Sequence, residues 1–310
     1  MTKRSIGAFF SVMERRDPTR TRTLRENFAS KLSGCYKRVA VKVRQKIVKE
    51  NFFNVHKVSE TPPLRILSGA VLENPVLNAF EYRWDESKID EFITWLERTF
   101  QEEVLFATTG PPVIGFSGRW TDLYIDSAYQ QGIRESRLEF QRAGHGVPGY
   151  GVSGQTLTAA FNQPIHVGPL LSLYTRVWTD LKGVNAATAS QISRVLALGI
   201  AEGKGIESVA REMVNRCDKI GRTRARLIAR TELVRAFNEA KLNEYKAHEI
   251  RSGETVKVQW WTALDERVRD SHRERHGKVY TKRVAVGMLG EPNCRCSLLP
   301  VFEDEEEFNQ

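Results

Sequence analysis

The chain has 310 residues, of which 41% are hydrophobic and 27% charged, and its formal net charge is +9. This length is enough for about two domains with a real core, and the sequence contains no apolar run long enough for a transmembrane span. Four cysteines, with Cys35 and Cys217 far apart, argue against a disulfide framework and favour a reducing compartment.

The positive charge is concentrated at the start of the chain. Residues 1–50 contain 14 Lys and Arg and four acidic residues, a balance of +10, so the remaining 260 residues sum to −1. With scattered apolar positions such as Leu24 and Phe28, this predicts exposed helices and a basic helical arm over residues 1–60. Such an arm attracts nucleic acid through counterion release, although solvated helix faces are an equally good interpretation. The candidate contacts are Arg15, Arg16, Arg20, Arg22 and Arg25.

A helical domain is predicted over residues 61–143. Apolar positions at helical spacing predict one helix over 87–106 and a second over 120–142. Closely spaced glycines between Gly144 and Gly154 then predict a flexible hinge or loop over 144–168. A glycine-rich loop can also cradle phosphate, but no GKS or GKT follows, so the linker interpretation is preferred.

Residues 169–302 are predicted to form helices followed by a small β module, and 303–310 an acidic tail. A helix from Pro169 stops at Gly183, a second is capped by Asn185, and a short and a long helix follow from Ile206 and about Arg222. This order resembles a helix-turn-helix reader, but an ordinary helical hairpin with a charged outer face is the preferred interpretation. The predicted fold class is α+β and mostly helical.

The most distinctive stretch runs from Arg230 to Pro300. Its long helix places Leu233 and Phe237 on an apolar face that we expect to be buried. Another face carries polar groups that can hydrogen-bond a neighbouring loop or strand or can equally face solvent, namely Thr231, Arg235 and Asn238. The alternation that follows from Val256 predicts a strand, and after it a short helix is predicted, capped at Asp270 or Ser271 and stopped by Gly277.

Four metal-capable side chains lie in the second half of this stretch: His272, His276, Cys294 and Cys296. The two histidines are four residues apart, on one face of a helical turn, and the two cysteines point the same way if the chain is extended. Two imidazoles and two thiolates suit tetrahedral zinc, but hydrogen-bonded structural residues are the preferred interpretation. A catalytic site would also need a general base, for which Glu274 is the nearby candidate.

Several motifs of this stretch occur together: IARTELVRAFNEA, WTALDERVRDSH with Gly277, and PNCRC followed by a proline. The combination resembles the Mu F-like head-morphogenesis proteins of tailed bacteriophages, which are minor capsid proteins associated with the portal. The close resemblance covers roughly residues 185–300. Its motif positions are Arg230, Thr231, Glu232, Arg235, Asn238, Asp265, Arg267, Arg269, Gly277, Glu291 and Pro292.

The resemblance implies a minor head protein that acts in procapsid morphogenesis and is not an enzyme. The implied partners are the portal protein, a scaffold or capsid protein, and DNA bound without sequence specificity, with no membrane. The implied location is the capsid interior of the virion, and the host cytoplasm during assembly. The alternative function is a metal-dependent hydrolase or toxin-like effector that uses His272, His276, Cys294 and Cys296. A free DNA-binding regulator is a third possibility.

The sequence departs from one variant of the family pattern, which reads D-E-R-T-C-x-x-C with H-P-N-C-R-C. Arg269 and His272 stand at the two cysteine positions of the first motif, and Glu291 replaces the histidine of the second. We therefore expect an ion pair between Arg269 and Glu291 to fasten the loop after the strand to the PNCRC segment, with His272 close to Cys294 or Cys296. No cofactor is expected on this account, and zinc is the alternative.

Overall fold

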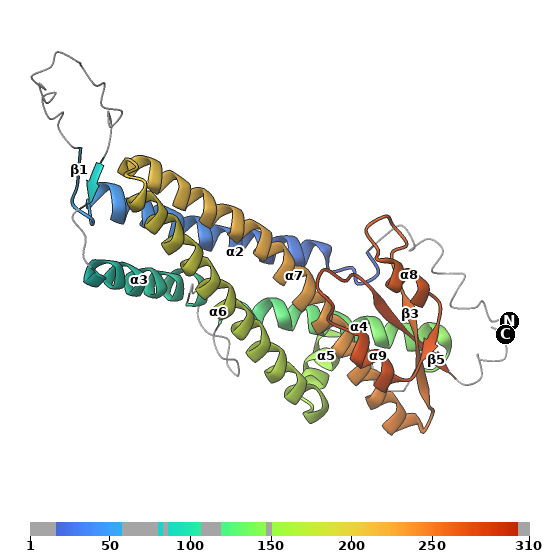
Figure 1. Ribbon diagram of the computed structural model, residues 1–310. Coiled ribbons are helices and arrows are strands. Elements are labelled where there is room, and N and C mark those ends of the chain that lie inside the picture. Colours follow the sequence, from blue (N-terminus) through green and yellow to red (C-terminus); the bar gives the residue numbers. More distant parts are fainter. Residues whose placement is uncertain (1–16, 58–79, 83–85, 107–118, 147–150, 303–310) are drawn as a thin grey trace, which may run out of the picture. The chain divides into compact units, whose positions relative to one another are not determined.

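The computed structural model describes residues 17–57, 80–82, 86–106, 119–146 and 151–302, which are drawn in colour in Figure 1. The chain divides into two compact units that interleave in sequence. Unit 1 comprises residues 1–30, 108–180 and 225–310, and unit 2 comprises residues 31–107 and 181–224. This division differs from the predicted linear order of domains. Arg15, Arg16 and the predicted acidic tail lie outside the described residues.

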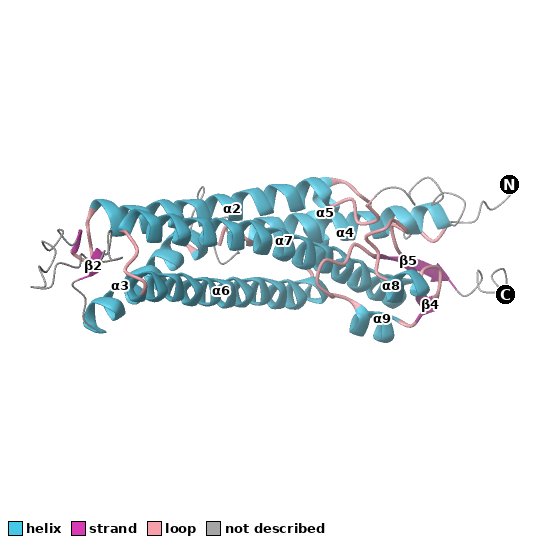
Figure 2. Ribbon diagram, turned by 45° about the horizontal axis from the view of Figure 1, so that its top comes forward, coloured by secondary structure: helices cyan, strands magenta, loops and turns pink. Residues whose placement is uncertain are grey.

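Helices make up most of the described chain, as the sequence predicts, and Figure 2 shows how few strands accompany them. The helices are α2 (Arg22–Arg44), α3 (Glu86–Phe100), α4 (Asp122–Ala143), α5 (Gly154–Phe161), α6 (Pro164–Ala201), α7 (Ile206–Ser252), α8 (Asp270–Arg275) and α9 (Lys282–Met288), with π turns at Gln45–Lys49 and Gln101–Leu105. The strands are β1 (Val55–Lys57), β2 (Phe80–Tyr82), β3 (Val256–Trp261), β4 (Val279–Tyr280) and β5 (Ser297–Phe302). None of the helices in the described parts is long and apolar enough to cross a membrane.

The helices predicted over 87–106 and 120–142 are confirmed by α3 with its π turn and by α4. The hinge predicted over 144–168 is wrong for much of its length, because α5 and the start of α6 occupy it. Ser153 explains why a helix begins there: its hydroxyl accepts a hydrogen bond from the Thr156 N–H at 3.4 Å and so caps α5. Among the described glycines of this stretch, Gly144, Gly146 and Gly151 lie outside helices.

Both α6 and α7 are longer than predicted. Gly183 and Asn185 lie inside α6, and within unit 2 the Asn185 Oδ1 accepts a hydrogen bond from the Tyr36 hydroxyl at 2.9 Å instead of capping a helix. Gly221 lies inside α7, where a Cβ would collide with the Tyr36 side chain. Glycine is therefore required there for close packing and does not break the helix. The turn between Ala201 and Ile206 joins α6 and α7 into a helical hairpin. This is the interpretation of the sequence that was preferred over a helix-turn-helix reader.

Helix α2 is not an exposed arm. Phe28 in unit 1 is 0% exposed and its ring centroid lies 5.1 Å from that of Trp120. In unit 2, Leu32, Val39 and Val43 are buried as well. These apolar residues recur at helical spacing, so they form one buried stripe while the basic residues take the other face. The prediction of exposed helices in this region is wrong for this reason.

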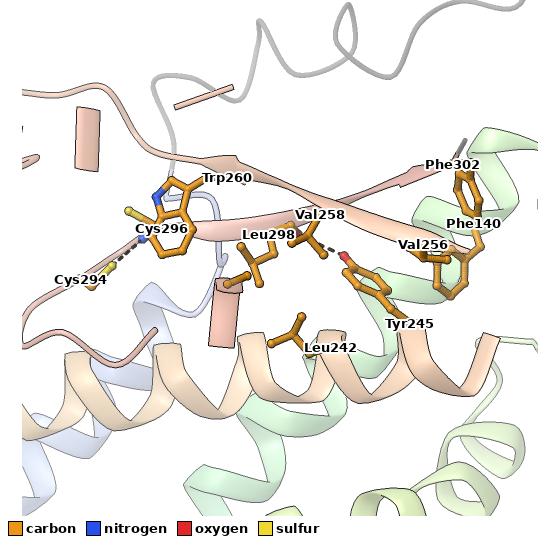
Figure 3. Packing of buried hydrophobic residues seen from close by; sticks show 11 residues of the cluster. Phe140, Leu242, Tyr245, Val256, Val258, Trp260, Cys294, Cys296, Leu298 and Phe302 are labelled. Atoms are coloured by element: carbon orange, nitrogen blue, oxygen red, sulfur yellow. Dashed lines mark hydrogen bonds between the residues drawn. The ribbon is translucent and has the colours of Figure 1, made fainter. Parts of the chain in front are cut away.

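A three-stranded antiparallel sheet in the order β4-β3-β5 packs on the second half of α7 in unit 1. Strand β3 pairs with β5 over its whole length, from Val256 opposite Phe302 to Trp261 opposite Ser297. Figure 3 shows the apolar layer beneath the two strands, where Leu242 and Tyr245 of α7 meet the strand side chains. Helix α4 crosses α7 closely at Gly132, where a Cβ would collide with the backbone at Phe237 and with Ala240.

Candidate functional site

The polar face of α7 fastens the end of the chain to the helix. The Asn238 Nδ2 donates to the Cys296 carbonyl at 2.9 Å, and its Oδ1 accepts from the Leu298 N–H at 3.2 Å. About two turns earlier, the Thr231 hydroxyl accepts from the Asn293 N–H at 3.2 Å. Of the two interpretations left open by the sequence, these two side chains follow the first, since they hydrogen-bond a neighbouring loop and strand.

Two other charged motif residues of α7, Glu232 and Arg235, contact neighbouring parts of the structure. Glu232 is buried and its Oε2 lies 2.9 Å from the Arg176 Nε of α6. Burial raises the pKa of Glu232, and the neighbouring Arg176 opposes that shift. The Arg235 Nε lies 3.7 Å from Glu239, and its guanidinium fills the space beside Gly290 that a larger residue would need.

Three of the four candidate metal ligands converge on one point. The His272 Nδ1 lies 3.2 Å from the Cys296 Sγ and 3.5 Å from the Cys294 Sγ, and the three donor atoms lie within 4.8 Å of one another. All three side chains are buried. Trp260 of β3 lies edge-on to the imidazole, with ring centroids 6.0 Å apart. The predicted proximity of His272 to the two cysteines is confirmed.

The charges in this cluster are coupled. The pKa of the Cys294 thiol is lowered, because Cys296 and then His272 hydrogen-bond to its sulfur. The pKa of Cys296 is raised by that hydrogen bond and by burial. The pKa of His272 is raised by the hydrogen bond with Cys294 and, less strongly, by the one with Glu291. The arrangement therefore favours a thiolate on Cys294 beside an imidazolium on His272.

Glu291 gathers three cationic or protonatable side chains at the edge of this cluster. Its Oε2 lies 3.0 Å from the Arg269 Nη1 and 2.7 Å from the His272 Nε2, and its Oε1 lies 3.1 Å from the Arg275 Nη1. The predicted ion pair between Arg269 and Glu291 is confirmed. It is exposed and uses one guanidinium nitrogen, since the other Arg269 Nη donates to the Pro292 carbonyl. These contacts join the segment before α8 to the segment before β5.

His276 lies apart from the cluster. It follows the last residue of α8 in an extended conformation, and its Nδ1 accepts from the Thr262 N–H at 3.1 Å. The expectation that His272 and His276 share a helical face is wrong, because α8 ends at Arg275 and Gly277 turns the chain at φ +78°. The predicted cap at Asp270 or Ser271 is also wrong, since Arg269 is the N-cap residue and makes no side-chain cap bond.

The donor set is suited to three of the four positions of a zinc site. Two thiols and an imidazole nitrogen are ligands that zinc prefers, and the contact of His272 Nε2 with a carboxylate orients the ring toward the sulfurs. Among the residues that the structure describes, no fourth His, Cys, Asp or Glu joins this group. A bound zinc would thus be held by His272, Cys294 and Cys296, with its fourth position left to another donor.

Asp265, in the loop before α8, is contacted by two arginines of the motif segments. Asp265 pairs with the Arg295 guanidinium and accepts from the Arg267 N–H at 3.1 Å. The arginines lower the pKa of Asp265, with Arg295 as the main cause. Arg230 of α7 is half-buried near the same loop.

The predicted nucleic-acid contacts that the structure describes all lie next to carboxylates. Arg20 lies 3.4 Å from Glu135, and Arg22 lies 2.9 Å from Glu26, one helical turn away. Arg25 is buried and pairs with Asp17. This placement argues against Arg25 as a phosphate contact.

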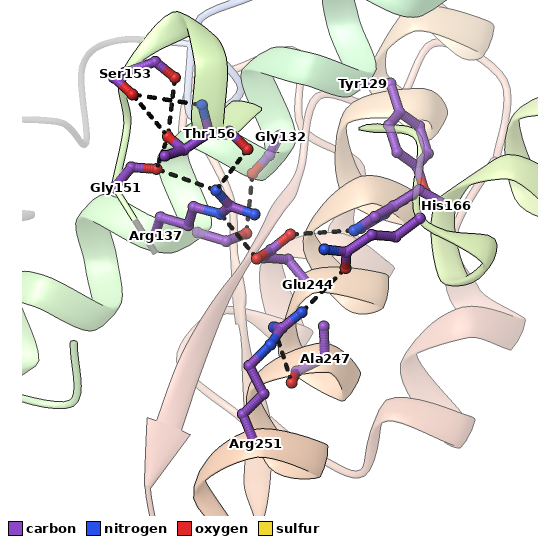
Figure 4. Close-up of polar contacts among 12 residues, drawn as sticks. Tyr129, Gly132, Arg137, Gly151, Ser153, Thr156, His166, Glu244, Ala247 and Arg251 are labelled. Carbon is purple, nitrogen blue, oxygen red and sulfur yellow. Dashed lines mark hydrogen bonds and ion pairs between the residues drawn. The ribbon is translucent and has the colours of Figure 1, made fainter. Parts of the chain in front are cut away.

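A buried polar network in unit 1 has no counterpart in the sequence analysis. The Arg137 Nε lies 2.9 Å from Glu244, whose other oxygen lies 3.2 Å from the His166 Nε2 (Figure 4). The Tyr129 hydroxyl lies 3.1 Å from the His166 Nδ1. In the sequence, charged residues such as Arg137 and Glu244 stand at helical spacing among the apolar positions of α4 and α7. That pattern is the feature from which this network could have been predicted.

Comparisons with known proteins found one family and three curated relatives. The family described as Phage Mu protein F like protein matches residues 190–299. Minor head protein GP7 of Bacillus phage SPP1 is 28% identical over 202 residues, which are 60% of this chain and 60% of the relative. An uncharacterised protein of Haemophilus influenzae is 25% identical over 198 residues, which are 58% of this chain and 43% of the relative.

A third relative, an uncharacterised protein of Methanocaldococcus jannaschii, is 29% identical over 121 residues, or 38% of this chain and 18% of the relative. The chain thus spans less than two thirds of the length of the curated relatives it matches. No solved structure matches the chain significantly. Thr231 and Asn238 of α7, His272 with the two cysteines beside it, and Glu291 all lie within 190–299. Through this segment, residues 190–299, the chain is similar to the family described as Phage Mu protein F like protein.

Proposed function

We propose that the protein is a minor head protein that acts in the assembly of a phage head. The observation that carries this proposal is the coincidence of two similarities. The family of Phage Mu protein F like proteins matches residues 190–299, and a minor head protein is similar over 202 residues. We further propose that it enters the procapsid through the portal protein or a scaffold or capsid protein. It then lies in the capsid interior and contacts packaged DNA.

The geometry of the family segment supports a scaffold role over catalysis. His272, Cys294 and Cys296 are buried. The carboxylate of Glu291 already contacts Arg269, Arg275 and His272. On the polar face of α7, Asn238 is used to fix the chain end through the Cys296 carbonyl and the Leu298 N–H. Interactions of this kind keep a module rigid.

Mass spectrometry of purified phage particles tests the proposal. We expect the protein at low copy number in intact particles, at a constant ratio to the major capsid protein after further purification. Particles emptied of DNA are the matched sample: loss of the protein with the DNA supports ejection, and retention supports a fixed place in the head. Its absence from intact particles that contain the portal protein would rule the proposal out.

A metal-dependent hydrolase is the second candidate, favoured by the convergence of His272, Cys294 and Cys296. A zinc held there would supply a Lewis acid. Glu274, the general base suggested by the sequence, is exposed on α8 and does not belong to the cluster. A hydrolytic activity that chelation abolishes, in a protein absent from particles, would favour this candidate over the first.

A further inference from the structure

A pocket of about 280 Å³ in unit 1 is lined by four arginines. Arg230 reaches it from α7, Arg267 and Arg269 from the loop before α8, and Arg295 from the segment before β5. Arg267 and Arg269 are exposed at its mouth, whereas Arg230 and Arg295 are half-buried. This volume is many times the roughly 10–15 Å³ that one water needs, so a tetrahedral anion fits.

The arginines of the pocket are not all neutralised. Asp265 pairs with Arg295, and Glu291 pairs with Arg269. In the parts of the chain that the structure describes, the guanidinium groups of Arg230 and Arg267 have neither an ion pair nor a hydrogen bond. Burial, and then the charges of Arg295 and Arg267, lower the pKa of Arg230. Like charges are therefore held together here, and an anion would relieve their repulsion.

Beyond the pocket, α7 carries a further arginine whose charge is not neutralised by an ion pair within the described residues. Arg226 lies one turn before Arg230, about 6 Å along the helix axis, and it is exposed. Within the described residues its side chain also has no ion-pair partner. Three such guanidinium groups, two in the pocket and one beyond it, suit a linear polyanion better than a single small ion, because each group can meet a separate charge. Guanidinium groups also match the geometry of phosphate oxygens.

We infer that this pocket binds a backbone phosphate of duplex DNA, with Arg230 and Arg267 as its contacts and Arg226 on the neighbouring phosphate. The inference rests on the proposed function, which brings the protein to packaged DNA, and it places the contact on the family segment instead of the N-terminal arm. Arg295 and Arg269 are held by Asp265 and Glu291 and form the walls of the pocket. Base edges are not read, so binding is independent of sequence.

The salt dependence of binding to a short fluorescent DNA duplex tests the inference on the full chain. Arg230→Gln and Arg267→Gln should each reduce the slope of log K against log salt by about 0.9, and the double variant by about twice that. Arg283→Gln on α9 is the matched control, because it removes an exposed charge of the same unit outside the pocket, and it should leave the slope unchanged. Arg230→Lys keeps the charge and should retain most of the slope. An unchanged slope in the double variant would overturn the inference.

A footprint on the unaltered protein removes any dependence on variant folding. Phenylglyoxal modifies accessible arginines, so DNA should protect Arg230 and Arg267 and leave Arg283 reactive. Equal reactivity with and without DNA would contradict the inference. So would protection by an acidic peptide with the sequence EDEEEF but not by DNA, since the occupant would then be a protein segment. Inorganic phosphate should protect only weakly, and protection by phosphate alone would mean a small-ion site.

The two proposals can fail separately. A protein that is present in particles but whose pocket variants bind DNA normally retains the proposed function and loses this inference. A protein that is absent from particles but loses DNA binding in the double variant loses the proposed function and keeps the pocket.

Discussion

Asn238 of α7 holds Cys296 at the start of β5 through its side-chain amide, at 2.9 Å from the Cys296 carbonyl, and the same amide accepts the Leu298 N–H at 3.2 Å. One buried side chain thus satisfies a backbone acceptor and a backbone donor of the entering strand. Unpaired backbone groups at a buried strand end are costly, so this amide sets where β5 begins pairing with β3.

Asn238→Ala should therefore destabilise the protein by about 2–4 kcal/mol, since two buried backbone groups lose their partner. Urea denaturation followed by circular dichroism measures the change. Ser127→Ala is the control, because Ser127 is exposed and bonds only to its own helix, and it should stay within about 0.5 kcal/mol of the parent. A cost below about 1 kcal/mol for Asn238→Ala would mean that water replaces the amide.

The buried pair of Lys241 and Glu139 gives a second prediction. The Lys241 Nζ lies 2.6 Å from Glu139, both side chains are almost fully buried, and the Tyr245 hydroxyl lies 3.1 Å from the same carboxyl group. Lys241→Met should cost roughly 3–5 kcal/mol, because it leaves a buried carboxylate without its counter-charge. The double variant with Glu139→Gln should recover part of that loss. A double variant that is less stable than Lys241→Met alone would show that the unpaired carboxylate does not destabilise the single variant.

The contrast between these two residues shows what the sequence can and cannot predict. Asn238 stands on a polar helix face, so its role as a hydrogen-bonding group follows from spacing. Lys241 is 1% exposed although lysine is usually at the surface, and only the fold brings Glu139 of α4 to it.

The sequence also predicted the ends of some helices wrongly. Gly183 predicted a helix end, because glycine is a weak helix former, and a new helix was predicted from about Arg222, next to Gly221. In the structure the neighbouring contacts decide instead, as at Gly221, where the Tyr36 side chain leaves no room for a Cβ. The sheet and the ion pair of Arg269 with Glu291 were predictable, since each depends on alternation or on the motif. The separation of His276 from His272 was not, since it depends on where a short helix ends.

Phe237 tests the assignment of the two faces of α7. It is 1% exposed, as predicted, and its backbone lies against Gly132 of α4. Phe237→Ala should cost about 3–5 kcal/mol, because the crossing of α4 and α7 cannot collapse around the cavity. Chemical denaturation gives the value, and Ile250→Ala at an exposed position of the same helix is the control. A change below about 1 kcal/mol would contradict the observed face.

Asp126 predicts how stability depends on pH. Burial raises its pKa to about 7, and the hydrogen bond from the Tyr174 hydroxyl only partly opposes the shift. Between the unfolded value of 3.8 and about 7, the native state therefore holds a proton that the unfolded state releases. Stability from this group is fully present below the unfolded pKa and falls as pH rises through that window.

Asp126→Asn should remove this slope, because the amide cannot ionise and its oxygen still accepts from Tyr174. At about 1.36 kcal/mol per pKa unit, the gain in stability at pH 8 has an upper limit of roughly 4 kcal/mol. Thermal unfolding from pH 4 to 8 measures it, with exposed Asp90→Asn as the control. A parent protein whose stability rises over this range, with the same rise in Asp126→Asn, would refute the assignment.

The last prediction separates the ion pair from a metal as the fastening of the C-terminal segment. Arg269→Ala should cost less than about 1 kcal/mol, because the pair is exposed and Glu291 keeps Arg275 and His272. Glu291→Ala should cost more, since it removes an acceptor shared by Arg269, His272 and Arg275, and adding Arg269→Ala to it should cost little further.

Because hydrogen bonds from Asn238 and Thr231 also hold this segment, a strong chelator should shift the melting temperature by no more than about 2 °C. Metal analysis of the purified protein is the companion measurement, and His272→Ala is the matched variant. One zinc per chain, lost in His272→Ala together with a large fall in melting temperature on chelation, would show that the three donors hold a structural metal. In that case the contacts of Glu291 orient His272 toward the metal, and the ion pair with Arg269 is secondary.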